Sequence, residues 1–171
     1  MRKSLDMLAR HQHLMVTLLS VWLILTSPWV SMFSKIPRQP GVFDRLHVWI
    51  GLITLVLTIT YSVSCLRNGG WRLYFPWLAG QVSQVGADLR GLFRARIPAA
   101  ESGGLFGALE GLTLLALLAT GVTGAGWLWA QGTSSAMEWR AAHMLLAHGL
   151  VVFVVLHTVA VALHVLDFIR E

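Results

Sequence analysis

The sequence predicts an all-α membrane protein, a four-helix transmembrane bundle with a short amphipathic interfacial helix between spans two and three. Of its 171 residues, 56% are hydrophobic, only 12% are charged, and seven are histidines. A soluble domain has about 45–50% apolar and about 25% charged residues, so a soluble core of this composition would lack a charged surface. We therefore expect a single transmembrane domain over residues 1–171.

Four stretches are long and apolar enough to cross a bilayer, which takes about 20 residues. They cover about 12–34, 47–66, 105–130 and 141–167. The long connection between the second and third begins with a turn signal, Asn68-Gly69-Gly70, and continues with aromatic residues from Trp71 to Trp77 that suit a membrane interface. The pattern from Leu78 to Phe93 predicts the short amphipathic helix on the membrane surface.

The basic residues orient the predicted spans. Four spans place both termini on one side, together with nine of the 13 Lys and Arg residues. The opposite side has four: Lys35, Arg38, Arg45 and Arg140. Because cytoplasmic segments are enriched in Lys and Arg, we expect both termini in the cytoplasm. The excess of Lys and Arg residues is then explained by membrane topology and by contact with membrane lipid. It gives no support to nucleic acid as a partner.

Two histidines on the fourth span predict a cofactor. His143 and His157 are 14 residues apart, which places them about 40° apart on one helix face and about 21 Å apart along its axis. That separation is too large for one metal ion, but it suits two stacked haems, since imidazole is a common axial ligand of haem iron. The single cysteine, Cys65, excludes covalent haem attachment through a Cys-x-x-Cys-His motif.

Each haem needs a second histidine at matching depth. His47 opens span two on the outer side, so it matches His143. His11 and His13 both lie at the cytoplasmic start of span one, and periodicity does not decide which of them matches His157. The prediction is therefore two bis-imidazole sites, one above the other.

The other candidate residues have structural alternatives. His148 is about 140° around the helix from His143 and is interpreted as structural. Gln81, Gln84 and His164 could lie near a quinone. His164 could instead support a haem propionate, and simple interfacial exposure is the favoured interpretation for it. Gly51, one turn after His47, would let a flat macrocycle approach. Three glycines of span three could serve ring packing or helix packing equally: Gly121, Gly124 and Gly126.

With these residues placed, the chain resembles the bacterial cytochrome b561 family and the related b-type cytochrome subunits of nickel–iron hydrogenases. The segments that carry the resemblance are Gln12-His13-Leu14, Leu46 to Gly51, and His143 to His157. The resemblance implies two non-covalent haem b groups as cofactors, held by His13 with His157 and by His47 with His143. It also implies a multi-pass protein of the bacterial inner membrane.

Two further segments, Gly70 to Pro76 and Glu110-Gly111-Leu112, are similar to the hydrogenase-type branch, whose members are usually longer. The small stand-alone members include superoxide oxidases that pass electrons to ubiquinone. The family therefore offers more than one partner for a chain of this kind.

The expected function is electron transfer between an outer-face (periplasmic) donor or acceptor and the quinone pool, ubiquinone or menaquinone. The outer partner could be superoxide, which makes the chain an oxidoreductase, or a periplasmic redox protein. An alternative is a cytochrome b membrane-anchor subunit of a hydrogenase- or dehydrogenase-type respiratory complex. A divalent-metal transporter is disfavoured, because it would need acidic residues beside the histidines inside the membrane. Only Glu110 approaches this requirement, and it lies at a span end.

Overall fold

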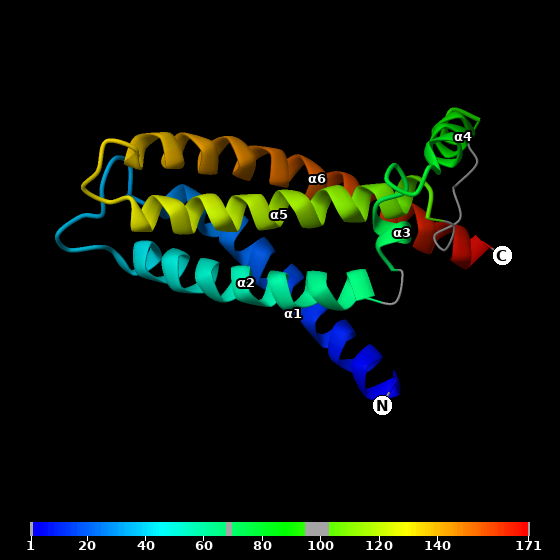
Figure 1. Ribbon diagram of the computed structural model, residues 1–171, viewed down its shortest axis with the longest axis horizontal. Coiled ribbons are helices and arrows are strands. Elements are labelled where there is room, and N and C mark those ends of the chain that lie inside the picture. Colours follow the sequence, from blue (N-terminus) through cyan, green and yellow to red (C-terminus); the bar gives the residue numbers. More distant parts are fainter. Residues whose placement is uncertain (1, 68–69, 95–102, 171) are drawn as a thin grey trace. The chain divides into compact units, whose positions relative to one another are not determined.

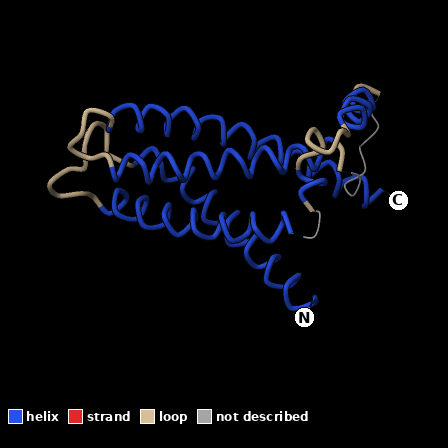
Figure 2. Tube along the Cα trace, in the orientation of Figure 1, coloured by secondary structure: helices blue, strands red, loops and turns tan. Residues whose placement is uncertain are grey.

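The computed structural model describes residues 2–67, 70–94 and 103–170, and within these ranges the regular structure is helical (Figures 1 and 2). The helices are α1 (Arg2–Thr26), the 3-10 helix η1 (Ser27–Trp29), α2 (Val42–Leu66), α3 (Trp71–Tyr74), α4 (Val82–Leu92), α5 (Leu105–Trp129) and α6 (Ala136–Arg170). The all-α prediction is therefore confirmed for the described residues.

Three helices are long and apolar enough to cross a membrane, as judged over the described residues by length and composition. They are α2, α5 and residues Ala136–Leu166 of α6, which correspond to the second, third and fourth predicted spans. Two of them begin earlier than predicted, α2 at Val42 instead of 47 and α6 at Ala136 instead of 141. In each case the first turn contains an acidic residue, Asp44 in α2 and Glu138 in α6, and precedes the uncharged residues on which the prediction rested.

The first predicted span differs most from the structure. Helix α1 ends at Thr26, and η1 follows with Pro28 in its first turn, whereas the predicted span reached residue 34. A proline inside an α-helix removes a hydrogen bond and clashes with the preceding turn, so the helix stops before it. Helix α1 is not among the three candidate membrane helices of the described chain, and the four-helix transmembrane bundle is not confirmed.

The long connection contains the expected short helix. It is α4, which covers Val82–Leu92 of the predicted 78–93 and is preceded by the single turn of α3. Asn68 and Gly69 of the predicted turn, and residues 95–102, lie outside the described residues.

The chain forms two compact units, which we describe separately. Unit 1 contains residues up to Ser64 together with Leu117–His148, and unit 2 contains Cys65–Ala116 together with the residues from Gly149 onward. Helices α5 and α6 contribute residues to both units. The single domain expected over residues 1–171 stays a prediction.

In unit 1, small residues let the helices pack closely. A Cβ atom at Gly121 of α5 would meet the Leu55 side chain of α2 at 2.9 Å, and one at Gly126 would meet the Trp139 ring of α6 at 2.5 Å. These two glycines therefore serve helix packing, as small residues commonly do between membrane helices. Gln12 Nε2 of α1 also donates a hydrogen bond to Thr60 Oγ1 of α2 at 3.3 Å.

The α1–α2 and α5–α6 connections of unit 1 lie at the same end of this unit (Figure 1). The backbone N–H of Ile36 donates to Gln131 Oε1 at 3.4 Å, and Arg140 Nε donates to the Met32 carbonyl at 3.4 Å. Side chains from both connections form a small core around Trp127. Its buried members are Met32, Trp127, Ala130 and Ala136, with Val30, Val48 and Leu128 packed against them.

In unit 2, a buried carboxylate joins α4 to the start of α5. Asp88, 9% exposed, accepts hydrogen bonds from Gln84 Nε2 and from the backbone N–H of Leu105, both at 2.9 Å. It thereby satisfies one of the N–H groups that a helix start leaves unpaired. Nearby, α5 packs directly on the backbone of the α3 segment, because a Cβ at Gly107 or Gly111 would collide with a backbone carbonyl there.

Candidate functional site

His47 lies in the second turn of α2, and Asp44 positions that turn. The Asp44 side chain is 1% exposed and accepts three hydrogen bonds, from the backbone N–H and the hydroxyl of Ser31 at 2.7 Å each and from the backbone N–H of Gly41 at 2.9 Å. Asp44 is the third residue of the helix, and its side chain accepts a hydrogen bond from the N–H of Gly41, the residue before the helix. This contact is one half of a capping box. The start of α2, and with it the backbone of His47, is thereby held against the preceding loop.

His143 lies on α6 and contacts α5 closely. Its Nδ1 donates a hydrogen bond to the Thr120 carbonyl at 2.9 Å. Because a carbonyl can only accept, Nδ1 carries the proton and Nε2 of the neutral ring keeps its lone pair, which is the state that a metal ligand needs. The ring also lies against Gly124, where a Cβ would meet His143 Cε1 and Nδ1 at 3.0 Å.

The structure brings His47 and His143 together in unit 1. Their ring centres are 6.3 Å apart and their planes are inclined at 87°. Both side chains are half-buried, and His47 Nδ1 is buried without a hydrogen-bond partner among the described residues. A buried polar nitrogen left without a partner is costly, so a bound group that gave His47 Nδ1 a partner would offset this cost.

The separation of the His47 and His143 rings is compatible with an iron bound between them in a porphyrin. An imidazole nitrogen binds a first-row metal at about 2 Å, so two imidazoles on opposite sides of one iron have their ring centres about 6 Å apart. Rotation of either ring about its metal bond leaves this separation unchanged, so an interplanar angle of 87° is compatible with it. Among the described residues no group of three or more His, Cys, Asp or Glu gathers as for a bare metal ion.

His13 is placed on α1, where its ring stacks on Tyr61 of α2. Their ring centres are 5.6 Å apart and their planes are inclined at 29°. His13 belongs to unit 1, whereas His157 lies on α6 in unit 2 and is half-buried. The pairing of His13 with His157 stays a prediction.

The remaining histidines have other surroundings. His148 is exposed, and its Nδ1 donates to the Met144 carbonyl of its own helix at 2.7 Å. His164 is exposed in unit 2 and contacts Phe106 of α5, with ring centres 6.1 Å apart. His11 is exposed on α1.

The glycine next to His47 faces open space. A Cβ at Gly51 would meet nothing within 4 Å, unlike one at Gly121, Gly124 or Gly126. The open position is one turn after a candidate iron ligand. Such an open position is expected of a glycine beside a flat macrocycle, and the haem contact itself stays a prediction.

Several residues near the candidate histidines were not predicted from the sequence. Asp44 has a readable signal, since Gly41 and Asp44 stand three apart at the start of an apolar run. Tyr61 and Trp127 have none, because an aromatic residue in a membrane helix ordinarily packs against lipid or a neighbouring helix. The Thr120 carbonyl could not be found from side-chain identity at all.

Comparison with known proteins yields a family. The family model described as prokaryotic cytochrome b561 matches residues 4–167. Neither the curated proteins nor the solved structures gave a significant match to the chain.

Proposed function

The chain belongs to the prokaryotic cytochrome b561 family, and from this membership we propose that it is a transmembrane di-haem b-type cytochrome transferring electrons between a periplasmic partner and the membrane quinone pool. The family makes it a membrane-integral, haem b-binding protein of electron transfer. The number of haems, the partners and the orientation are the parts that we propose.

The observation that carries the proposal is the His47–His143 pair. The two imidazoles come from different helices and have ring centres 6.3 Å apart, and together they would hold the iron of one haem. The Thr120 carbonyl keeps the His143 ring in the tautomer that binds metal. Asp44 holds the start of α2, which carries His47. These residues orient the iron, and the haem supplies a one-electron redox centre when bound.

We assign a second haem to His13 and His157. His157 follows His143 by 14 residues on α6, a rise of about 21 Å along the helix, so the two haems would relay electrons across the bilayer. For this assignment α1 must be the fourth crossing helix. Its charge-free residues from His11 onward end at Thr26, and a tilt or local thinning of the bilayer accommodates a short apolar helix.

The proposed orientation places both termini in the cytoplasm of a bacterium and the His47–His143 haem near the periplasmic face. Superoxide and a periplasmic redox protein are the two proposed outer partners. Lys35, Arg38, Arg45 and Arg140 of that face attract anions such as superoxide, although pairing with haem propionates or flanking of the helices explains them equally. Ubiquinone or menaquinone is the proposed membrane partner.

A reduced-minus-oxidised absorbance spectrum of the purified protein, with the haem-to-protein ratio, tests the proposal. We expect two low-spin b-type haems per chain, and reduction of both by a water-soluble quinol. One haem per chain would refute the di-haem assignment. Haems that a quinol does not reduce, in a protein that co-purifies with a stoichiometric dehydrogenase, would favour the membrane-anchor subunit instead.

A further inference from the structure

We infer that the indole N–H of Trp127 donates a hydrogen bond to a propionate carboxylate of the haem held by His47 and His143, an inference that rests on the proposed function. Trp127, on α5, is 7% exposed, and its Nε1 is buried without a hydrogen-bond partner among the described residues. A buried indole N–H usually has an acceptor, because an unpaired one has lost its hydrogen bond to water without a replacement. Trp127 therefore lacks an acceptor that a ligand would supply.

The neighbours of Trp127 connect it to the helices that carry the candidate iron ligands. It packs in one cluster with Val48, the residue after His47, and it follows by three residues Gly124, against which the His143 ring lies. All of these residues belong to unit 1. The side chains of this cluster are apolar, and apart from the weakly accepting sulfur of Met32 none of them offers a hydrogen-bond acceptor to the indole N–H.

Trp127 is more informative than the other unpartnered atoms of unit 1. These are Gln12 Oε1, Ser20 Oγ and His47 Nδ1 among the described residues. A serine hydroxyl can rotate onto a carbonyl of its own helix, and the amide of Gln12 already bonds Thr60 through its nitrogen. The indole N–H is a donor only and is fixed in the plane of its ring, so it cannot find a partner by rotating as a hydroxyl does.

The chemistry of the acceptor follows from the cofactor. A haem b held by two axial imidazoles has no polar atom other than its two propionate carboxylates for a donor beside its edge. A carboxylate is the stronger kind of acceptor, because a charged partner shortens and strengthens the hydrogen bond. Trp127 would thus anchor the haem against rotation and offset part of the negative charge near the iron.

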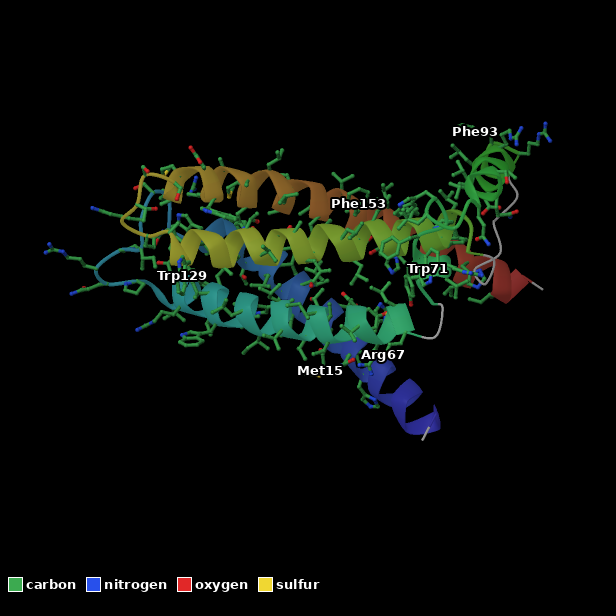
Figure 3. All side chains as sticks on the ribbon, viewed as in Figure 1. Met15, Arg67, Trp71, Phe93, Trp129 and Phe153 are labelled. Carbon is green, nitrogen blue, oxygen red and sulfur yellow. The ribbon has the colours of Figure 1, made fainter. Side chains whose placement is uncertain are left out.

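The variant Trp127→Phe tests the inference, since it keeps an aromatic ring and removes the N–H. Trp129→Phe is the matched control, because Trp129 is two residues away on α5, 93% exposed and labelled in Figure 3. Two measurements use the purified holoprotein, namely the midpoint potential of each haem and the rate of haem release to excess apomyoglobin. The affected haem is identified as the one that His143→Ala loses.

We expect Trp127→Phe to speed release of that haem by about ten- to a hundred-fold, the effect of losing a hydrogen bond to a charged group. Its midpoint potential should fall, because an uncompensated carboxylate stabilises the oxidised iron. Protein loaded with haem dimethyl ester, which has no free carboxylate, should show no difference between Trp127→Phe and wild type. Trp129→Phe should match wild type in every measurement.

Three results would overturn the inference. One is wild-type release and potential in Trp127→Phe. Another is an equal effect of the variant with haem and with its dimethyl ester, which would mean that the ring packs and its N–H is idle. The third is an unchanged haem with slower reduction by quinol, which would assign the N–H to a quinone carbonyl. In all three the protein still binds haem, so the proposed function stands, whereas a wild-type protein without haem would end both.

Discussion

Gly124 sets how closely the His143 ring approaches α5. A Cβ there would lie 3.0 Å from two ring atoms, so Gly124→Ala must displace the imidazole by a few tenths of an ångström, or bend the hydrogen bond to Thr120. We predict a changed low-spin electron paramagnetic resonance signal for one haem and weaker retention of it. Gly149→Ala on α6, where a Cβ would meet nothing within 4 Å, is the control and should leave the spectrum unchanged.

Gly51 differs from Gly124, because a Cβ added at Gly51 would meet no other atom within 4 Å. Gly51→Leu meets no protein atom within 4 Å of its Cβ, and leucine favours a helix over glycine by up to about 1 kcal/mol. We therefore expect a helix that is at least as stable and a loss of one haem, because the side chain would occupy the place of the macrocycle. Full haem content in Gly51→Leu would show that the macrocycle lies elsewhere.

Tyr61 is expected to hold the ring of His13. The two rings stack with centres 5.6 Å apart, and such pairs contribute about 0.5–1.5 kcal/mol beyond their buried area. Tyr61→Leu removes the stacking and should alter the resonance signal of the haem that His13→Ala loses, whereas Tyr61→Phe should keep it. If both variants match wild type, Tyr61 does not position an iron ligand.

At the scale of elements, the start of α2 depends on one buried carboxylate. Asp44→Asn replaces the acceptor of three hydrogen bonds by a neutral amide, and a hydrogen bond to a charged group contributes about 1.5–3 kcal/mol. We predict a lower thermal unfolding midpoint and a looser haem beside His47. Glu138→Gln, an exposed acid in the first turn of α6, is the control; an equal effect there would mean that Asp44 acts only through helix charge.

Helix ends were the least predictable part of the fold. Hydropathy located α5 within one residue at its carboxyl end, since apolar residues run to Trp129. Hydropathy placed the start of the second span after the start of α2, because the first turn of α2 is held by a hydrogen bond between Asp44 and Gly41. Hydropathy does not register such polar contacts. It carried the first span past Pro28, because the residues around the proline are themselves apolar.

The candidate site also has a part that the sequence predicts and a part that it does not. Helical periodicity and topology predicted that His47 and His143 share a depth, and the structure places their rings 6.3 Å apart. Contacts that fix the rings could not be predicted, because a backbone carbonyl such as that of Thr120 has no sequence signature, and which neighbour each glycine contacts depends on tertiary packing.

At the scale of the whole molecule, the proposed topology requires α1 to cross the membrane. In a Cys65→Ser background, we expect Ile36→Cys to react with a membrane-impermeant maleimide added to intact spheroplasts. Phe93→Cys, 85% exposed on the connection between α4 and α5, should react only after lysis, and tags at both termini should be protected. Termini on opposite sides would show that α1 does not span.

The most direct test of the central claim is the haem content of His47→Ala and His143→Ala, measured singly with a redox titration of each, and with His148→Ala as control. Because both rings are assigned to one iron, each variant should retain one haem per chain, and the two should retain the same one, with the same potential and absorbance band. His148→Ala should keep both haems. Loss of different haems in the two variants, or retention of both haems in either, would contradict the account.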